Sequence, residues 1–132
     1  MSNWMMAGCF SAGVLAALVT GCASREVEVT GEVSAAVGTN VKGPIALELY
    51  DSKGSGEEQE LERVHSTNLP TLGKFSEKAD FAGDRLIARA IDDRNQDGAC
   101  SAGEAWAEVE TAIHDDDSTD AIALVLSVKP CP

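Results

Sequence analysis

The chain has 132 residues, with 22 acidic and 10 basic side chains, and a net charge of −12 at pH 7. This acidity argues against nucleic acid as a partner, because neutralising phosphates needs clustered Lys and Arg. It also argues against electrostatic docking on anionic lipid. None of the charged residues lies within residues 1–21, so the acidic part is residues 22–132, enough for one small domain.

Residues 1–21 are predicted to be a signal peptide. Residues 5–19 are almost all apolar or small, and this run is shorter than the roughly 20 residues that a transmembrane helix needs. The segment ends in Leu-Val-Thr-Gly-Cys at residues 18–22, which resembles the lipobox of bacterial lipoproteins. The resemblance implies cleavage before Cys22 and attachment of lipid to its thiol. Cleavage without lipidation is the alternative.

Lipid on Cys22 would attach the protein to a membrane of the bacterial cell envelope. Ala23 and Ser24 follow the cysteine, where an aspartate would resemble the signal for retention at the inner membrane of Gram-negative cells. Its absence favours the outer membrane in a Gram-negative cell. Residues 22–26 are then a short tether, and residues 27–132 are expected to form a monomeric domain close to the membrane surface.

The cysteines predict one disulfide in the mature domain. Cys9 leaves with the signal peptide and Cys22 takes the lipid, so Cys100 and Cys131 remain as a pair in an oxidising compartment. A bond between them closes a loop of roughly 30 residues, which is worth roughly 3–4 kcal/mol. Two free thiols are the alternative.

Short runs with a period of two, bounded by turn residues, predict strands along most of the mature chain. The clearest alternation covers residues 26–34 and residues 122–128. Further strands are expected at residues 45–50, 61–66, 75–81 and 85–92, with loops at 51–58 and 70–73. About seven strands with this spacing predict an all-β fold, a small antiparallel Ig-like β-sandwich.

Residues 105–113 allow two interpretations. Trp106, Val109 and Ile113 stand at helical spacing, whereas Ala105, Ala107 and Val109 alternate as in a strand. The strand is favoured and the helix stays open.

Residues 93–104 carry the one motif with a defined chemistry, D-x-N-x-D-G followed by five residues and Glu. Side-chain oxygens two residues apart can converge on a calcium ion, with Gly98 permitting the sharp turn. The predicted ligands are the side chains of Asp93, Asn95, Asp97 and Glu104 and the carbonyl of Ala99. A plain acidic turn is the alternative.

The residues before this loop form strands rather than a helix, so a true EF-hand is not expected. An affinity of about 0.1–1 mM, as in extracellular modules, indicates a structural role for calcium.

This loop and its neighbouring strands resemble the transthyretin-like (prealbumin-like) sandwich domains, which include the carboxypeptidase regulatory-like domains of bacterial surface proteins. The resemblance covers about residues 27–128 and includes residues 29–33 and 43–47, similar to the first two strands of that family. The other matching residues are Phe75, Gly83, Leu86, Ile87, Ala88, Ala90, Asp93, Asn95, Asp97, Gly98, Gly103 and Glu104. The resemblance implies a non-catalytic domain that serves in folding, display or binding.

No enzyme is expected, because the two imidazoles, His65 and His114, lack an accompanying nucleophile motif. His114 with residues 115–117 is a weaker metal-site candidate, and a solvated acidic loop is the favoured alternative. Trp106 and Tyr50 could stack on a sugar ring, although Trp106 is better explained as a core residue.

The sequence therefore predicts a non-catalytic, envelope-anchored lipoprotein module that calcium stabilises. One alternative is a surface binding protein for a glycan or an envelope protein, using loops at one end of the sandwich. Another is a weak calcium sensor.

Overall fold

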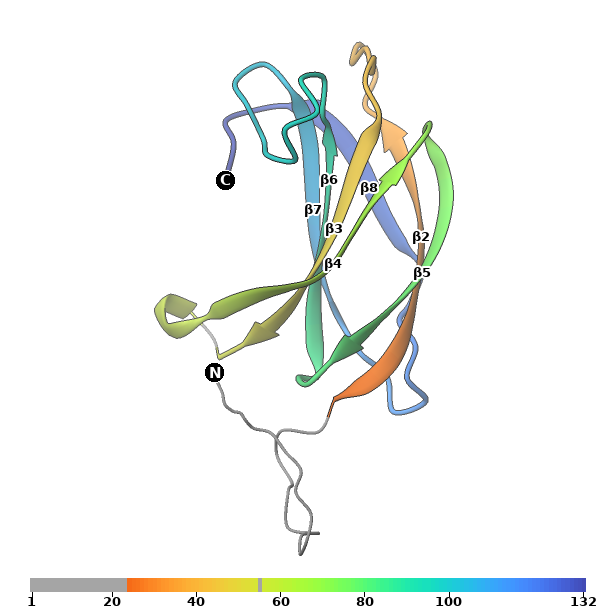
Figure 1. Ribbon diagram of the computed structural model, residues 1–132, viewed down its shortest axis with the longest axis vertical. Coiled ribbons are helices and arrows are strands. Elements are labelled where there is room, and N and C mark those ends of the chain that lie inside the picture. The colour runs from red at the N-terminus through yellow and green to blue at the C-terminus, as the bar shows by residue number, and fades with distance from the viewer. Residues whose placement is uncertain (1–23, 55) are drawn as a thin grey trace, which may run out of the picture.

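The computed structural model describes residues 24–54 and 56–132 as an all-β domain (Figure 1). The predicted signal peptide and the lipidation site Cys22 lie outside these residues. Within these residues the only helix is a single turn, η1 (Gly56–Glu58), and none of the described helices is long and apolar enough to cross a membrane. The described residues form seven strands: β2 (Arg25–Ala35), β3 (Ile45–Lys53), β4 (Glu60–Leu69), β5 (Gly73–Phe81), β6 (Arg85–Asp92), β7 (Ala105–Ala112) and β8 (Ile122–Val128).

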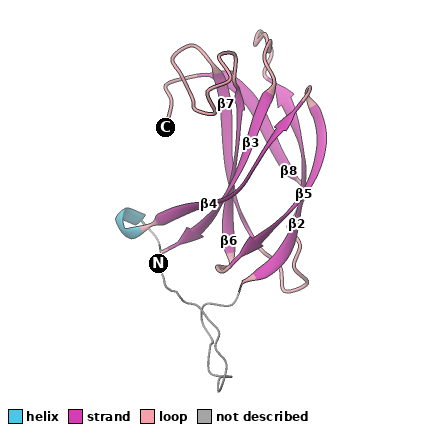
Figure 2. Ribbon diagram, viewed as in Figure 1, coloured by secondary structure: helices cyan, strands magenta, loops and turns pink. Residues whose placement is uncertain are grey.

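The strands form one sheet in the order β4-β3-β6-β7-β8-β2-β5. The sheet folds over on itself into a nearly closed, barrel-like sandwich, with β4 and β5 as its two edges (Figure 2). Across this opening, His65 Nε2 of β4 lies 2.8 Å from Glu77 Oε1 of β5. The predicted all-β sandwich is thus confirmed.

One pair of strands departs from the antiparallel arrangement that the sequence predicted. β2 and β8 run parallel, with Gly31 opposite Ile122 and Ala35 opposite Leu126. Direction is fixed by a tight turn only where consecutive strands pair. The first and last strands of the domain meet without such a turn, so their alternation carried no information on direction.

The core is formed by the inward faces that the alternation predicted. In β2, Val27 and Val29 are fully buried, and in β8 so are Leu124 and Leu126. Val128, which continues the pattern in β8, is instead 59% exposed, because it lies at the strand's end. All fully buried apolar side chains of the core lie between residues 27 and 126. The described domain therefore has a complete core of its own.

Gly31 allows β2 to approach its neighbours at the start of the parallel pairing. A Cβ at this position would lie 2.3 Å from the carbonyl oxygen of Ile122 and 2.7 Å from the Phe75 ring. Because glycine has no side chain, the Phe75 ring can occupy the space inside the sandwich that a side chain at position 31 would otherwise fill.

Residues 105–112 form strand β7, which confirms the favoured interpretation of this segment. Ala105 and Ala107 face the main core, whereas Trp106 lies on the opposite face of the sheet. Trp106 is nevertheless only 8% exposed. The helical spacing arises because this strand is buried on both faces at its start, where C-terminal residues 129 and 130 contact Trp106 on the outer face.

The prediction of a loop at residues 51–58 was wrong for residues 51–53. β3 continues to Lys53, and Asp51 is only 2% exposed. Its carboxylate accepts hydrogen bonds from the backbone amides of Ala82 (3.0 Å) and Gly83 (3.2 Å) in the turn between β5 and β6. Polar residues are typical of loops, so nothing in the sequence indicated that Asp51 is a buried strand residue that accepts hydrogen bonds from a neighbouring turn.

Loops gather at two opposite ends of the sandwich (Figure 1). One end holds the start of β2, where Arg25 pairs with Asp117 of the β7–β8 loop at 3.2 Å. The other end holds the β2–β3 loop, the β6–β7 loop and the C-terminal residues. The predicted calcium loop therefore lies at the end remote from the N-terminal strand's first residue.

Candidate functional site

The β6–β7 loop, residues 93–104, begins and ends with buried carboxylates. Asp93 and Glu104 are each 4% exposed. Asp93 Oδ2 accepts a hydrogen bond from the backbone amide of Gly98 at 2.8 Å, and its Oδ1 accepts one from Asp97 at 3.3 Å. Gly98 has a φ of +76°, which turns its amide back toward the start of the loop.

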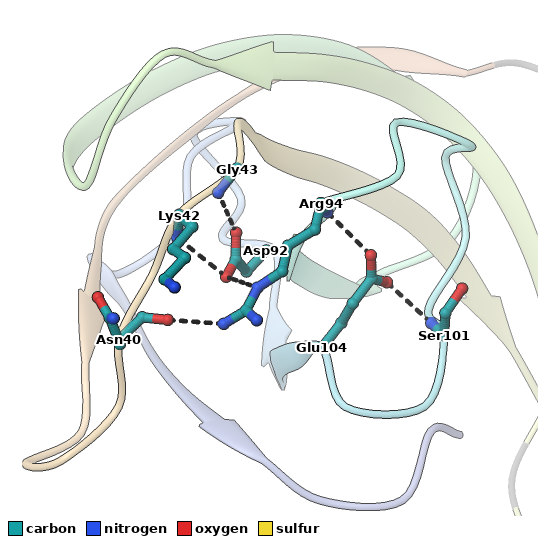
Figure 3. A network of polar contacts seen from close by, with 7 residues as sticks. All are labelled: Asn40, Lys42, Gly43, Asp92, Arg94, Ser101 and Glu104. Carbon is teal, nitrogen blue, oxygen red and sulfur yellow. Dashed lines mark hydrogen bonds and ion pairs between the residues drawn. The ribbon is translucent and has the colours of Figure 1, made fainter.

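Glu104 closes the loop from its other end (Figure 3). One carboxylate oxygen, Oε2, accepts a hydrogen bond from the backbone amide of Arg94 at 2.8 Å, and Oε1 accepts one from Ser101 at 2.8 Å. Buried carboxylates are tolerated when hydrogen bonds replace water. Glu104 therefore joins the first and last turns of the loop.

The middle of the predicted ligand set is exposed and bonded within the loop. Asn95 Nδ2 donates to Asp97 Oδ2 and to Ser101 Oγ, both at 3.2 Å. Asp97 Oδ1 accepts a hydrogen bond from the backbone amide of Ala99 at 3.0 Å. These contacts are those of a self-bonded Asx turn.

The predicted ligands fit calcium in their chemistry. They are hard oxygen donors with the loop spacing that calcium accepts. However, the described residues contain no grouping of three or more His, Cys, Asp or Glu side chains placed to hold one ion. Each bonded carboxylate oxygen keeps a further lone pair that can face an ion.

Asp92, which directly precedes the calcium-type motif, is the most buried polar residue of this end, with an exposed fraction of 0%. Its carboxylate accepts hydrogen bonds from the backbone amides of Lys42 (3.2 Å) and Gly43 (2.7 Å) in the β2–β3 loop and from Arg94 Nε (3.1 Å). Arg94 Nη2 donates in turn to the carbonyl of Asn40 at 2.8 Å.

Figure 3 shows this network joining the β2–β3 loop to the β6–β7 loop. The close approach depends on Gly43, where a Cβ would lie 3.0 Å from the carbonyl oxygen of Asp93. A Gly-Pro turn together with an aspartate at the end of a strand was the available sequence signal, but nothing in it related the two segments.

The predicted disulfide is confirmed, since Cys100 and Cys131 are bonded with their Cα atoms 5.8 Å apart. It ties the C-terminal residues to the β6–β7 loop. Beneath it, Ala46, Ile91 and Trp106 form a second, small apolar cluster on the outer face of the sheet, with Cys100 packed against them. These three residues lie side by side on β3, β6 and β7.

Trp106 is a core residue of this cluster rather than an exposed platform for a sugar ring. Its Nε1 hydrogen-bonds to the carbonyls of Lys129 (3.3 Å) and Pro130 (3.1 Å). Lys129 Nζ lies 4.4 Å from the ring centroid. The tail that covers Trp106 is thus held by both polar contacts and the disulfide.

Tyr50 lies half-buried on the same outer face, in a row of polar contacts. Its hydroxyl donates to Glu48 Oε1 at 2.7 Å, and the Arg89 guanidinium lies 4.9 Å from its ring centroid. Burial raises the pKa of Tyr50 above its ordinary value, and the hydrogen bond to Glu48 raises it further. The phenol therefore remains a hydrogen-bond donor throughout the neutral range.

The two imidazoles each pair with a carboxylate. His65 contacts Glu77, as described above, and His114 Nε2 lies 3.0 Å from Asp120 Oδ1. That hydrogen bond to Asp120 raises the pKa of His114, with a smaller coulombic contribution from Asp116 and Asp115. Residues 114–117 do not form a metal-holding group in the described part of the chain.

Comparisons with known protein families, with curated proteins and with solved structures give no match to this chain.

Proposed function

We propose that this chain is a non-catalytic lipoprotein module of the bacterial cell envelope, anchored through lipid on Cys22 and stabilised by calcium in the β6–β7 loop. The observation that carries the proposal is the lipobox sequence at residues 18–22, placed directly before a disulfide-bonded domain. Such bonds persist in exported proteins and are rare in the cytosol. β2 begins at Arg25, so the linking segment is short, and the outer membrane is the favoured location in a Gram-negative cell.

The contacts of the histidines support a non-catalytic role. In the described residues, neither His65 nor His114 hydrogen-bonds to a hydroxyl or thiol that it could activate. Their partners are carboxylates that hold them on a strand edge and in an exposed loop.

The anchoring of the β6–β7 loop supports a structural rather than a signalling role for calcium. Asp92 joins this loop to the β2–β3 loop, and the disulfide joins it to the C-terminal tail. A sensor needs an element with two arrangements of similar free energy. A loop fixed from both sides favours local reorientation of side chains over a large conformational change.

The test of the anchor is metabolic labelling of the full chain with palmitate in a Gram-negative host. We expect label on the wild-type protein and recovery in the membrane fraction. Cys22→Ser should abolish both, because the acylated thiol is removed. Cys9→Ser is the matched control, since Cys9 is the other cysteine of the N-terminal segment, and it should keep the label. Wild-type protein that carries no palmitate label and is recovered in the soluble fraction would contradict the proposal.

A further inference from the structure

A polar cleft lies on the outer face of the sheet, beneath the β6–β7 loop. It consists of two adjoining hollows of about 340 and 360 Å³, which share Glu48, Arg63 and Gly98 in their walls. Strands β3, β4 and β6 supply its floor and one side, and the loop and C-terminal tail supply the other. Each hollow is of the size that small-molecule sites have.

The floor of the cleft is a fixed row of hydrogen bonds. Arg63 Nη1 donates to Glu48 Oε2 at 3.1 Å, and the Tyr50 hydroxyl donates to the other oxygen of Glu48. On the far side of Tyr50, Arg89 donates to Glu108 through Nε (2.9 Å) and Nη2 (2.6 Å). Glu48 is only 4% exposed. Side chains held in this way on strands have little freedom to lose when a ligand binds.

Unused hydrogen-bonding groups line the side of the cleft. In the described part of the chain, the side chains of Ser66, Asn68 and Gln96 make no hydrogen bond, although all three face the same hollow. Each of these side chains can both donate and accept. The cleft thus combines fixed charged groups below with free neutral groups beside them.

The charges in the cleft favour an uncharged ligand. Its walls hold Arg63 and Arg89 against Glu48, Asp93 and Asp97. The side chains of the cleft therefore carry a net charge of only −1, on a chain of net charge −12. Both arginines are already paired with glutamates, which weakens the attraction of an anion. A ligand that donates and accepts at many adjacent positions, without a charge of its own, matches this lining.

The position of the cleft makes it accessible in an anchored protein. Its walls include Gln96 and Gly98 of the β6–β7 loop, whereas β2 starts at the opposite end of the sandwich (Figure 1). A strand of eight residues, the length of β6, spans about 26 Å. The cleft extends from this loop along β3 as far as Tyr50, which pairs with Ile87 near the start of β6, so its loop end is the part remote from the start of β2.

We propose that this cleft, with Tyr50, Arg63, Ser66, Asn68 and Gln96 around the buried carboxylate of Glu48, binds a neutral saccharide. Vicinal hydroxyl groups supply the alternating donors and acceptors that the lining requires. This inference goes beyond the proposed function and depends on neither the lipid nor the calcium, so a failure of either leaves it testable.

The test is an NMR titration of ¹⁵N-labelled residues 23–132, which contain the complete core. The probes are maltotriose, cellotriose, the N-acetylated trimer of glucosamine and the trimer of mannose, all uncharged, each added up to about 10 mM, where weak binding is still visible. We expect saturable shifts of backbone amides in residues 48–50, 63–68 and 96–98 with at least one of them. Ser66→Ala with Asn68→Ala should weaken this binding about tenfold through two lost hydrogen bonds.

That double variant should keep its fold, because neither side chain has a hydrogen bond to lose. Arg63→Ala should also weaken binding, whereas the matched Arg85→Ala should not. Arg85 is similarly exposed and similarly paired with a glutamate, but it lies outside the cleft. The proposal is overturned if no probe shifts these residues, if the double variant binds as wild type does, or if only a lysine-rich peptide added as a fifth probe produces the shifts.

Discussion

At the scale of single residues, buried carboxylates that accept hydrogen bonds from backbone amides hold several loops and turns of this domain in place. Asp51 receives two amides of the β5–β6 turn, and Asp92 receives two of the β2–β3 loop. Asp93 and Glu104 do the same within the β6–β7 loop. A buried amide without a partner costs about 1–3 kcal/mol. Each of these side chains therefore helps to fix the conformation of the loop or turn whose amides donate to it.

Asp92→Ala should lower the free energy of unfolding by about 3 kcal/mol or more, because two amides and the Arg94 guanidinium lose their acceptor. Urea denaturation of residues 23–132 measures it. The control is Asp80→Ala, an exposed aspartate of β5, expected within about 0.5 kcal/mol of wild type. Equal stability of the two variants would show that the Asp92 contacts contribute nothing.

At the scale of elements, the β6–β7 loop shows that a sequence motif can predict a loop without predicting whether its side chains bind an ion or the loop's own backbone. Calcium loops and Asx turns draw on the same residues, since both need short side-chain oxygens and a glycine at the turn. The spacing from Asp93 to Glu104 predicted that these oxygens belong to one loop. It could not tell whether they face a common centre or the backbone amides.

Calcium should raise the melting temperature of residues 23–132 relative to EDTA. A dissociation constant of about 0.1–1 mM contributes about 0.4–1.4 kcal/mol at about 1 mM calcium, which corresponds to roughly 2–10 °C. Asp97→Asn should remove this difference while keeping an oxygen for the Ala99 amide.

Asp116→Asn is the matched control for the calcium effect, because Asp116 is an exposed aspartate of the other acidic loop. Calcium should raise the melting temperature of this variant as much as that of the wild type. If Asp116→Asn rather than Asp97→Asn loses the response, the site lies near His114. If calcium changes nothing, the β6–β7 loop is an acidic turn.

The strands themselves were largely predictable from alternation. Residues 122–128 coincide with β8, and residues 26–34 lie within β2 (Arg25–Ala35). Alternation reports which side chains face the core, but it is silent on which strands are neighbours. The parallel pairing of β2 with β8 and the contact of Asp92 with Gly43 both join distant segments. Single-sequence patterns are local, so these features appeared only in the structure.

At the scale of the whole molecule, the domain has a second apolar cluster outside its sandwich. Trp106 and its neighbours on β3 and β6 are covered by the C-terminal tail, which the disulfide holds in place. A small domain gains much from such a covalent link. The disulfide thus serves the packing of the outer face as well as the β6–β7 loop.

Replacing both Cys100 and Cys131 with serine should lower the stability by roughly 3–4 kcal/mol. Trp106 is the only tryptophan in residues 23–132, so its fluorescence reports the tail directly. We expect a red shift of the emission under native conditions, as the released tail exposes the indole to water. Emission identical to that of wild type would mean that the hydrogen bonds from Trp106 to the tail suffice without the disulfide.

The open side of the sandwich has a consequence for copies crowded on one surface. β4 and β5 end the sheet, and exposed strand edges of this kind can recruit a strand from another molecule. Here the edges are lined with charge, including Glu60, Glu62, Lys74 and Lys78, and His65 with Glu77 spans the opening. Lateral fusion of neighbouring sheets is thereby discouraged, and the net charge of −12 keeps the copies apart.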